Sequence, residues 1–252
     1  MPDPAQPTVR LIPNLRAWWH QQTSHGRLPA IGRLIALCCE FLLDSLPARR
    51  RQRYGDVDYD WDHRVDTTSA TVNWRDRLLG LLNSPYQPTE PALFHEALAS
   101  LNLAFRDFTF IDIGSGKGRT LLMASDYPFR RIIGVELLPE LHRVAEENIR
   151  KYKSDPQQCF AIESICRDAR DFIFPPEPTV LYLFNPLPEA GLEHVLGNLE
   201  QSLRDHPRPL FVIYHNPVLK HVLVDSKWLA KTGGTHQYSI FQGCRKSNNE
   251  LD

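Results

Sequence analysis

Three glycines at alternate positions mark the segment from Asp112 to Arg119, DIGSGKGR, which directly continues the short apolar run Phe108–Ile113. Glycine lets a backbone turn tightly and approach a bound molecule without a side-chain clash. A helix that follows such a turn aims its first amide groups at the same place. The segment therefore predicts a strand, a turn and a helix that together cradle a nucleotide-type ligand.

Two common phosphate-binding loops do not fit this spacing. A P-loop needs a glycine five residues before the Gly-Lys pair, where this chain has Ile111, and Arg119 follows Gly118. The dinucleotide fingerprint Gly-x-Gly-x-x-Gly would require a glycine in place of Arg119. The P-loop is therefore excluded, and a nicotinamide-dependent oxidoreductase is disfavoured but stays open as an alternative.

Acidic residues stand at the ends of three consecutive predicted strands. A carboxylate at Asp112 would repel phosphates, so it favours a ligand that lacks a pyrophosphate and carries positive charge. Glu136, 22 positions after Gly114, can accept hydrogen bonds from ribose hydroxyls, and Asp168 offers an acceptor for an adenine amino group. S-adenosylmethionine, with its amine and its sulfonium, combines these features.

The DIGSGKGR turn, the VEL strand end and the RDA segment resemble the successive cofactor motifs of the class I S-adenosylmethionine-dependent methyltransferases, over roughly residues 90–245. The resemblance implies a seven-stranded sheet with the last strand antiparallel, and S-adenosyl-L-methionine as cofactor. It assigns Glu136 to the ribose and Asp168 to the adenine. The amino-acid part of the cofactor would be held by Asp112, Gly114, Ser115, Gly116 and Gly118.

A short segment upstream, SPYQPT over residues 84–89, is similar to a Tyr/Phe-x-Pro segment of some protein-lysine methyltransferases of this class. This similarity adds Tyr86 and Thr89 to the candidate cofactor-binding residues.

The predicted fourth and fifth strands end in the candidate catalytic residues. Asn185-Pro186 is similar to the Asn/Asp-Pro-Pro-aromatic motif of amino-methyltransferases, but Leu187 and Pro188 replace the second proline and the aromatic. Asn185 would orient an amine, or simply end the strand in a turn. Tyr214 and His215 reach the same crevice by this reading, and a histidine there can act as a general base or serve structure.

Apolar runs alternate with amphipathic segments from about residue 90 onward, beginning with a helix at Glu90–Leu101. Strands are predicted at Phe108–Ile113, Arg131–Leu137, Cys159–Ile165, Thr179–Phe184, Leu210–Tyr214 and His236–Phe241. Apolar strands separated by such helices indicate a mainly parallel sheet covered on both faces. The predicted fold class is α/β: a Rossmann-like, doubly wound, mainly parallel seven-stranded sheet.

The region before this domain lacks the regular alternation of strand-like and helix-like segments. We predict a mostly helical or irregular N-terminal extension over residues 1–90 that covers the active-site crevice, a methyltransferase domain over residues 90–245, and a polar tail over residues 246–252. Asp56–Asp62 alternates acids with apolar residues, which predicts an extended strand whose aromatic face packs. A calcium loop is excluded there, because Trp61 replaces the turn glycine and Thr67 the final glutamate.

The apolar run Ile31–Leu46 predicts a helix, which falls short of the ~20 residues that a bilayer span needs. Because four arginines follow it by residue 53, peripheral contact of residues 31–53 with an anionic membrane stands beside simple packing on the domain.

Composition narrows the class further. The 252 residues carry 29 basic and 30 acidic side chains, so no overall charge draws the chain to nucleic acid. Five cysteines without a C-x-x-C pair, and no secretory signal, predict a cytoplasmic protein without a disulfide framework, and the histidine spacing predicts no metal. The expected function is methyl transfer to a nucleophile of a protein, such as lysine, or of a small molecule; a cofactor-binding module without turnover is the alternative.

Overall fold

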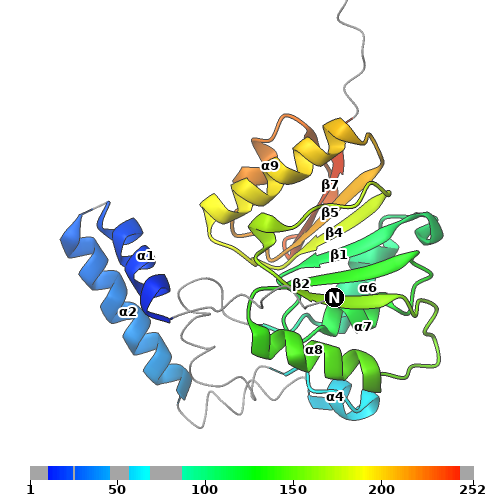
Figure 1. Ribbon diagram of the computed structural model, residues 1–252, viewed down its shortest axis with the longest axis horizontal. Coiled ribbons are helices and arrows are strands. Elements are labelled where there is room, and N and C mark those ends of the chain that lie inside the picture. The colour runs from blue at the N-terminus through cyan, green and yellow to red at the C-terminus, as the bar shows by residue number, and fades with distance from the viewer. Residues whose placement is uncertain (1–10, 25, 46–56, 69–86, 245–252) are drawn as a thin grey trace, which may run out of the picture.

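The computed structural model describes residues 11–24, 26–45, 57–68 and 87–244. Its N-terminal part is helical: α1 spans Leu11–Thr23, α2 spans Arg27–Ser45 and α4 spans Val57–His63. α1 and α2 lie side by side, and α2 confirms the predicted helix over Ile31–Leu46 as far as Ser45, although it begins earlier (Figure 1). No described helix is long and apolar enough to cross a lipid bilayer. The predicted polar tail, 246–252, lies outside the described residues.

A seven-stranded sheet forms the centre of the fold, in the order β3-β2-β1-β4-β5-β7-β6 (Figure 1). The strands are β1 Thr109–Ile113, β2 Arg131–Glu136, β3 Ile162–Cys166, β4 Thr179–Leu183, β5 Leu210–His215, β6 Leu229–Gly234 and β7 Tyr238–Gly243. Neighbours from β3 to β5 pair in parallel, and β7 pairs antiparallel with both β5 and β6. The Rossmann-like sheet with its antiparallel last strand is therefore confirmed.

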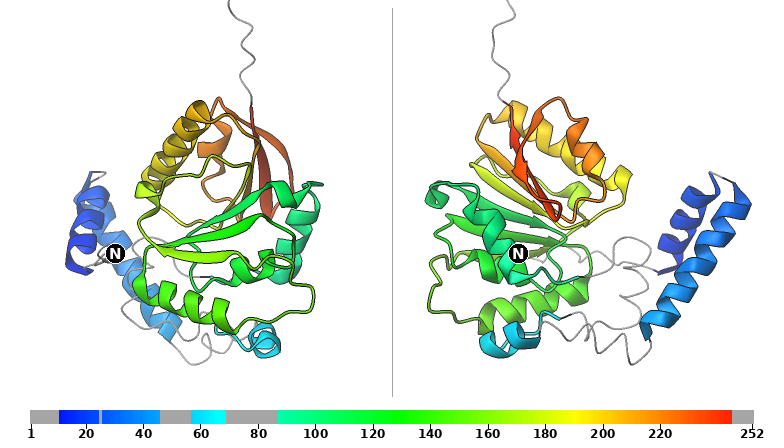
Figure 2. Two further views of the ribbon diagram at one scale, coloured as in Figure 1. Left: turned by 45° about the vertical axis from the view of Figure 1, so that its right-hand side comes forward. Right: turned by 180° about the vertical axis from the view of Figure 1, so that it is seen from behind.

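Helices cover both faces of the sheet, as Figure 2 shows from two sides. The helical elements of this domain are α6 Pro91–Ala99, η3 Phe105–Asp107, α7 Arg119–Ala124, α8 Pro139–Lys151, η4 Ala169–Asp171, α9 Glu189–Asp205 and α10 Lys220–Val224. Buried side chains of α6 and α7 pack with Phe110 and Val180 on one face. On the other face, α9 and α10 pack with Ile111 and Leu181. Alternate residues of each strand thus enter opposite cores, which explains why the strands read as apolar throughout.

Two strand predictions differ from the structure. The third strand begins at Ile162 instead of Cys159, because the amides of Gln158 and Cys159 donate to the carbonyl of Ser125 and not to β2. The strand pattern also missed β6, whose residues are mostly exposed and whose register shifts between Lys231 and Gly233. An irregular strand at the edge of a sheet lacks the apolar periodicity that identifies buried strands.

The extended strand predicted over Asp56–Asp62 is wrong, because the described residues 57–63 form the helix α4. Helical spacing brings Tyr59 and His63 together, and their rings stack with centroids 4.3 Å apart. The same geometry turns Asp60 inward, whereas Trp61 is 81% exposed. The aromatic face predicted for an extended segment therefore does not exist: Tyr59 packs against the core, whereas Trp61 points to solvent.

The carboxyl ends of the parallel strands meet at one edge of the sheet. There β1 leads into the glycine turn before α7, β2 ends at Glu136, and β4 and β5 end beside Asn185 and His215. Ligands of open α/β sheets bind beyond these ends. The residues chosen from the sequence thus share the edge at which a site is expected. The domain boundary near residue 90 stays a prediction.

Candidate functional site

The turn after β1 uses all three glycines in a left-handed conformation. Their φ angles are 78° at Gly114, 54° at Gly116 and 84° at Gly118, a region that other residues rarely adopt. A Cβ atom on Gly114 would lie 2.6 Å from Cβ of Pro186, in the turn after β4. The turn therefore needs glycine for its backbone conformation and, at Gly114, for close approach to the neighbouring strand end.

Asp112 lies beneath this turn with only 3% of its surface exposed. Its Oδ2 accepts a hydrogen bond from the hydroxyl of Thr120, the second residue of α7. The pKa of Asp112 is raised to about 7, chiefly by burial; the hydrogen bond from Thr120 opposes this rise, and the charge of Glu136 adds to it. A buried carboxyl group with a raised pKa is suited to receive a cationic group, because a positive charge would favour its ionised form.

Glu136 faces the glycine turn from the end of β2. Its Oε2 accepts from the amide of Gly116 at 2.8 Å, and its Oε1 accepts from the amide of Leu138 at 2.8 Å. The carboxylate therefore joins the ends of β1 and β2.

Asp168 follows β3 and caps the short helix η4. It accepts from the backbone amide of Arg170 at 2.9 Å and forms an ion pair with the Arg170 side chain at 2.5 Å. The hydrogen bond from Arg170 lowers the pKa of Asp168 below its ordinary value. Asp168 is ionised and lies at a strand end beside Glu136, since β2 and β3 pair from Ile132 through Glu136. Its assignment to adenine stays a prediction.

Asn185 joins the turns that follow β4 and β5. Its Oδ1 accepts from the hydroxyl of Tyr214 at 2.8 Å and from the amide of Val218 at 3.3 Å, while Nδ2 donates to the carbonyl of Asn216 at 2.7 Å. Both asparagines have positive φ, 43° at Asn185 and 44° at Asn216. The structure thus brings Asn185 and Tyr214 into direct contact, with their polar atoms bound to each other and to the backbone. Their catalytic roles stay predictions.

His215 belongs to a buried polar chain beside Asp112. Its Nδ1 lies 2.7 Å from the hydroxyl of Tyr182, which lies 3.3 Å from the hydroxyl of Thr89. The imidazole stacks on Phe184 with ring centroids 4.4 Å apart. Burial lowers the pKa of His215 to about 4 and raises the pKa of Tyr182 above its usual range, so both groups are neutral at physiological pH. Thr89 reaches the site through this chain, whereas Tyr86 lies outside the described residues.

Ser115 and Gly134 pack together where the glycine turn crosses β2. A Cβ atom on Gly134 would lie 2.7 Å from Oγ of Ser115 and 2.6 Å from a methyl carbon of Leu121. Oγ of Ser115 is buried and has no hydrogen-bond partner among the described residues. Gly134 was not among the predicted site residues, although a glycine inside an apolar strand is a signal of close backbone approach.

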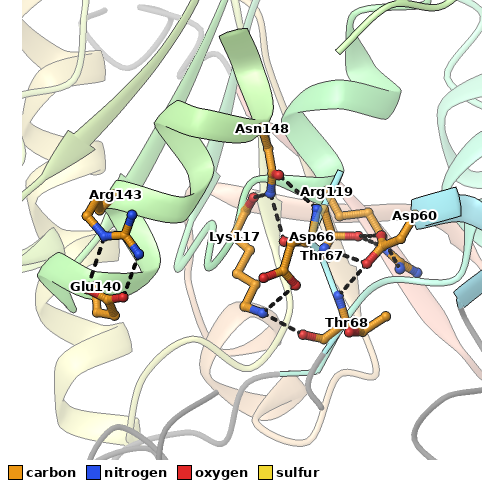
Figure 3. A network of polar contacts seen from close by, with 9 residues as sticks. All are labelled: Asp60, Asp66, Thr67, Thr68, Lys117, Arg119, Glu140, Arg143 and Asn148. Carbon is orange, nitrogen blue, oxygen red and sulfur yellow. Dashed lines mark hydrogen bonds and ion pairs between the residues drawn. The ribbon is translucent and has the colours of Figure 1, made fainter. Parts of the chain in front are cut away.

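Three further residues at the glycine turn were also not selected from the sequence. Lys117 and Arg119, each 2% exposed, and Asn148 of α8 contact the segment after α4 (Figure 3). In the sequence, Lys117 and Arg119 stand beside glycines and carry no signal beyond the turn itself. Their partners lie about fifty or more residues earlier, so local spacing does not reveal them. Among the described residues, no cluster of His, Cys, Asp and Glu is arranged to hold a metal ion.

Comparison with known proteins yields similarities of fold. No protein-family model matches the chain, and no curated protein matches it in sequence. A precorrin-6y C5,15-methyltransferase structure from Geobacter metallireducens GS-15 is 16% identical and has a TM-score of 0.45, with 63% of this chain and 90% of that chain covered.

Two further solved structures show the same kind of similarity. An RNA methyltransferase from Salinibacter ruber in complex with S-adenosyl-L-homocysteine is 17% identical, with 66% of this chain and 99% of that chain covered and a TM-score of 0.41. The putative methyltransferase yhhF from Escherichia coli is 14% identical, with 63% and 89% covered and a TM-score of 0.44. At such low identity, function is better inferred from the geometry of the site.

Proposed function

We propose that the chain is an S-adenosylmethionine-dependent methyltransferase. The observation that carries this proposal is the placement of two carboxyl groups, Asp112 and Glu136, beneath and beside a turn of three left-handed glycines. The glycines allow the left-handed conformation of the turn, and the buried acid favours a cationic ligand. When bound, S-adenosylmethionine supplies a methyl group on a sulfonium, which an aligned nucleophile displaces.

The residues of this chain have three tasks in such a reaction. Asp112 accepts a hydrogen bond from the ammonium group of the cofactor's amino-acid part. Glu136 accepts hydrogen bonds from the ribose hydroxyls, and Asp168 accepts one from the adenine amino group. In-line displacement then requires the acceptor atom to be held near the methyl group, aligned and shielded from water. We assign the acceptor to the carboxyl ends of β4 and β5, where Asn185, Tyr214 and His215 lie.

The affinity for S-adenosylmethionine is expected to depend on pH through Asp112. With a pKa of about 7 in the free protein, this carboxyl group is largely protonated in mildly acidic solution, and the cation must displace its proton. The dissociation constant should therefore fall by about tenfold between about pH 6 and about pH 7.5. Isothermal calorimetry across this interval measures the effect, and a flat profile would contradict the assignment of the cation to Asp112.

The acceptor is an amine or another nucleophile of a protein, such as a lysine, or of a small molecule. His215 supports this part of the proposal, because a neutral imidazole at the end of β5 can accept a hydrogen bond from the nucleophile. Tyr182 fixes the ring through Nδ1, which leaves Nε2 for the acceptor.

Substitution of His215 by Asn should lower the rate of methyl transfer by about tenfold or more while leaving the cofactor affinity unchanged. His221→Asn is the matched control, because His221 is half-exposed and pairs with Glu189 at 2.9 Å, away from this chain of contacts. Single-turnover transfer and calorimetry separate the two effects. Equal losses of rate in both variants would remove His215 from the reaction.

A cofactor-binding module without turnover is the second candidate. The observation that favours it is the engagement of both side-chain polar atoms of Asn185 by Tyr214, Val218 and Asn216. Because the two contacts of Oδ1 use its acceptor positions, Asn185 cannot accept a hydrogen bond from a substrate amine unless these contacts rearrange.

Labelled S-adenosylmethionine distinguishes the candidates. The protein is incubated with the labelled cofactor and a size-fractionated lysate, and label is followed into macromolecules and small metabolites. Transfer that Asp112→Ala abolishes supports the enzyme, whereas binding without transfer to any fraction supports the silent module. Thermal stabilisation by NAD but not by S-adenosylmethionine would point instead to a nicotinamide-dependent oxidoreductase.

A further inference from the structure

The end of α4 and the segment after it form a compact structure, which we call the strap and define as residues 60–68. Asp60 organises it: its Oδ2 accepts from the amides of Thr67 at 2.7 Å and Thr68 at 3.0 Å, and its Oδ1 accepts from the Thr67 hydroxyl. Asp60 and both threonines are buried. The strap is therefore a defined structure, held by one carboxylate, and not a loose connection.

The strap contacts the glycine turn through Lys117. Nζ of Lys117 donates to Oδ1 of Asp66 and to the carbonyl of Thr68, each at 2.8 Å (Figure 3). Lys117 stands between Gly116 and Gly118, and its side chain is 2% exposed. A lysine is rarely buried unless it is paired, so the strap supplies the partners that this position in the turn requires.

Arg119 makes a second set of contacts at the first residue of α7. Its Nε donates to the Thr67 hydroxyl at 2.6 Å, and one terminal nitrogen lies 3.2 Å from Oδ1 of Asp60. Its guanidinium also lies over the ring of Tyr59, 4.9 Å from the centroid. The residues on both sides of Gly118 are thus fixed by side chains of α4 and the strap.

Asn148 of α8 joins the strap to the glycine turn from a third direction. Its Oδ1 accepts from the amide of Asp66 at 2.9 Å, and its Nδ2 donates to the carbonyls of Asp66 at 2.8 Å and Lys117 at 2.9 Å (Figure 3). Asn148 is 2% exposed. One buried amide therefore binds the backbone of the strap and the backbone of the turn at the same time.

Glycine-rich turns have many accessible backbone conformations, so a ligand that binds one of them must first select it. A turn that is already held in the binding conformation avoids this loss of affinity. Gly116 donates to Glu136, but the flanking side chains Lys117 and Arg119 point to the strap instead. The position of the turn is therefore set from both sides: by Glu136 at the end of β2 and by the strap.

We propose that Asp66 and Asn148 are positioning residues of the cofactor site, which act through Lys117 and hold the glycine turn in its binding conformation. This inference rests on the proposed function. It makes residues 60–68 part of the cofactor site, although they precede the sheet domain and do not supply a predicted ligand contact.

Asp66→Ala tests the inference, because the carboxylate of Asp66 is 46% exposed and its removal should leave the fold intact. Loss of a hydrogen bond to a charged group is expected to weaken S-adenosylhomocysteine binding by about tenfold. In the ligand-free protein, the amides of Gly116, Lys117 and Gly118 should exchange with solvent about tenfold faster. Asp66→Asn retains an acceptor oxygen and should restore part of both losses.

Glu177→Ala is the matched control. Glu177 accepts from Arg131 at 3.0 Å and is more buried than Asp66, with 23% of its side chain exposed. It lies at the opposite ends of the strands, since Arg131 begins β2. This variant should change neither the affinity nor the exchange of the glycine turn. Unchanged binding and exchange in Asp66→Ala, or equal changes in Glu177→Ala, would overturn the inference.

The two measurements, ligand binding and amide exchange in the ligand-free protein, test this inference and the proposed function separately. If the wild-type chain binds neither S-adenosylmethionine nor S-adenosylhomocysteine, the proposed function fails. Amide exchange in the ligand-free protein then still decides whether the strap holds the turn, because that measurement requires no ligand.

Discussion

Asp112→Asn is expected to weaken S-adenosylmethionine binding by roughly ten- to a hundredfold, the loss typical of a hydrogen bond to a charged group. Asparagine has the shape of aspartate and can still accept from Thr120, so the turn itself should be preserved. What disappears is the negative charge opposite the cofactor's ammonium. Calorimetry with the cofactor and with its product measures the loss, and undiminished affinity would remove Asp112 from the site.

The same substitution is expected to stabilise the ligand-free protein. The pKa of Asp112 is raised from 3.8 to about 7 on folding, so its contribution to stability is complete below about pH 4 and is lost as the pH rises through about 7. A neutral asparagine avoids this decrease in the free energy of unfolding, which amounts to at most about 4 kcal/mol. The Tm of Asp112→Asn should thus exceed that of the wild type by several degrees at about pH 8 and equal it near pH 4.

Thr120→Val provides a control for this interpretation. The Thr120 hydroxyl lowers the pKa of Asp112, so its removal should move the pH dependence of cofactor binding to higher pH while the carboxyl group remains. A lower Tm for Asp112→Asn than for the wild type at alkaline pH would show that the carboxylate stabilises the fold, contrary to the expectation from its burial.

The sheet and its ligand-binding edge were predictable because the signals are local. Each of β1, β2, β4 and β5 is a short apolar run buried on both faces. The acids Asp112, Glu136 and Asp168 lie at or just after strand ends, so their positions in the sequence are sufficient to identify them. Parallel strands place their carboxyl ends at one edge, so residues far apart in sequence could be grouped without coordinates. The contact between Glu136 and the glycine turn follows from this rule.

Side-chain networks between distant segments were not predictable. Asp60 was read as one of four acids in an extended segment, but it lies in a helix and binds Thr67, Thr68 and Arg119. Alternation of polar and apolar residues over seven positions does not distinguish a strand from two helical turns when one acid has a buried partner. The pairing of Lys117 with Asp66 likewise depends on how the chain folds back, which no local spacing encodes.

The chain from Thr89 through Tyr182 to His215 shows the same limit. His215 was selected because it ends a strand, but Tyr182 lies inside the fully buried β4 and reads as an ordinary core residue. Register explains its role, since Tyr182 pairs with Asp112 across β1 and β4. The Tyr182 hydroxyl can therefore be assigned to the site only when the pairing of β4 with β1, which places Tyr182 beside Asp112, is known.

Gly114→Ala is expected to damage both the fold and the site. Alanine at a φ of 78° costs about 1–3 kcal/mol in backbone strain. The new Cβ would also lie 2.6 Å from Cβ of Pro186, so the turn after β4 must shift. That turn contains Asn185, which binds Tyr214, and the disturbance therefore extends from the cofactor side to the acceptor side. We expect a Tm lower by several degrees and a loss of measurable cofactor binding.

Gly197→Ala is the matched control for Gly114→Ala, because the chemical change is the same and the surroundings differ. Gly197 lies within α9, its φ is not positive, and a Cβ there would meet nothing within 4 Å. Alanine is favoured over glycine inside a helix by about 1 kcal/mol, so this variant should raise the Tm and leave cofactor affinity unchanged. Opposite signs of the two Tm changes would show that Gly114→Ala destabilises the protein because of the left-handed turn, and not because alanine in general is unfavourable in place of glycine. A Gly114→Ala protein that retains wild-type stability and affinity would mean that the turn can relax without its left-handed glycine, and the backbone cradle would then lose its role in holding the cofactor.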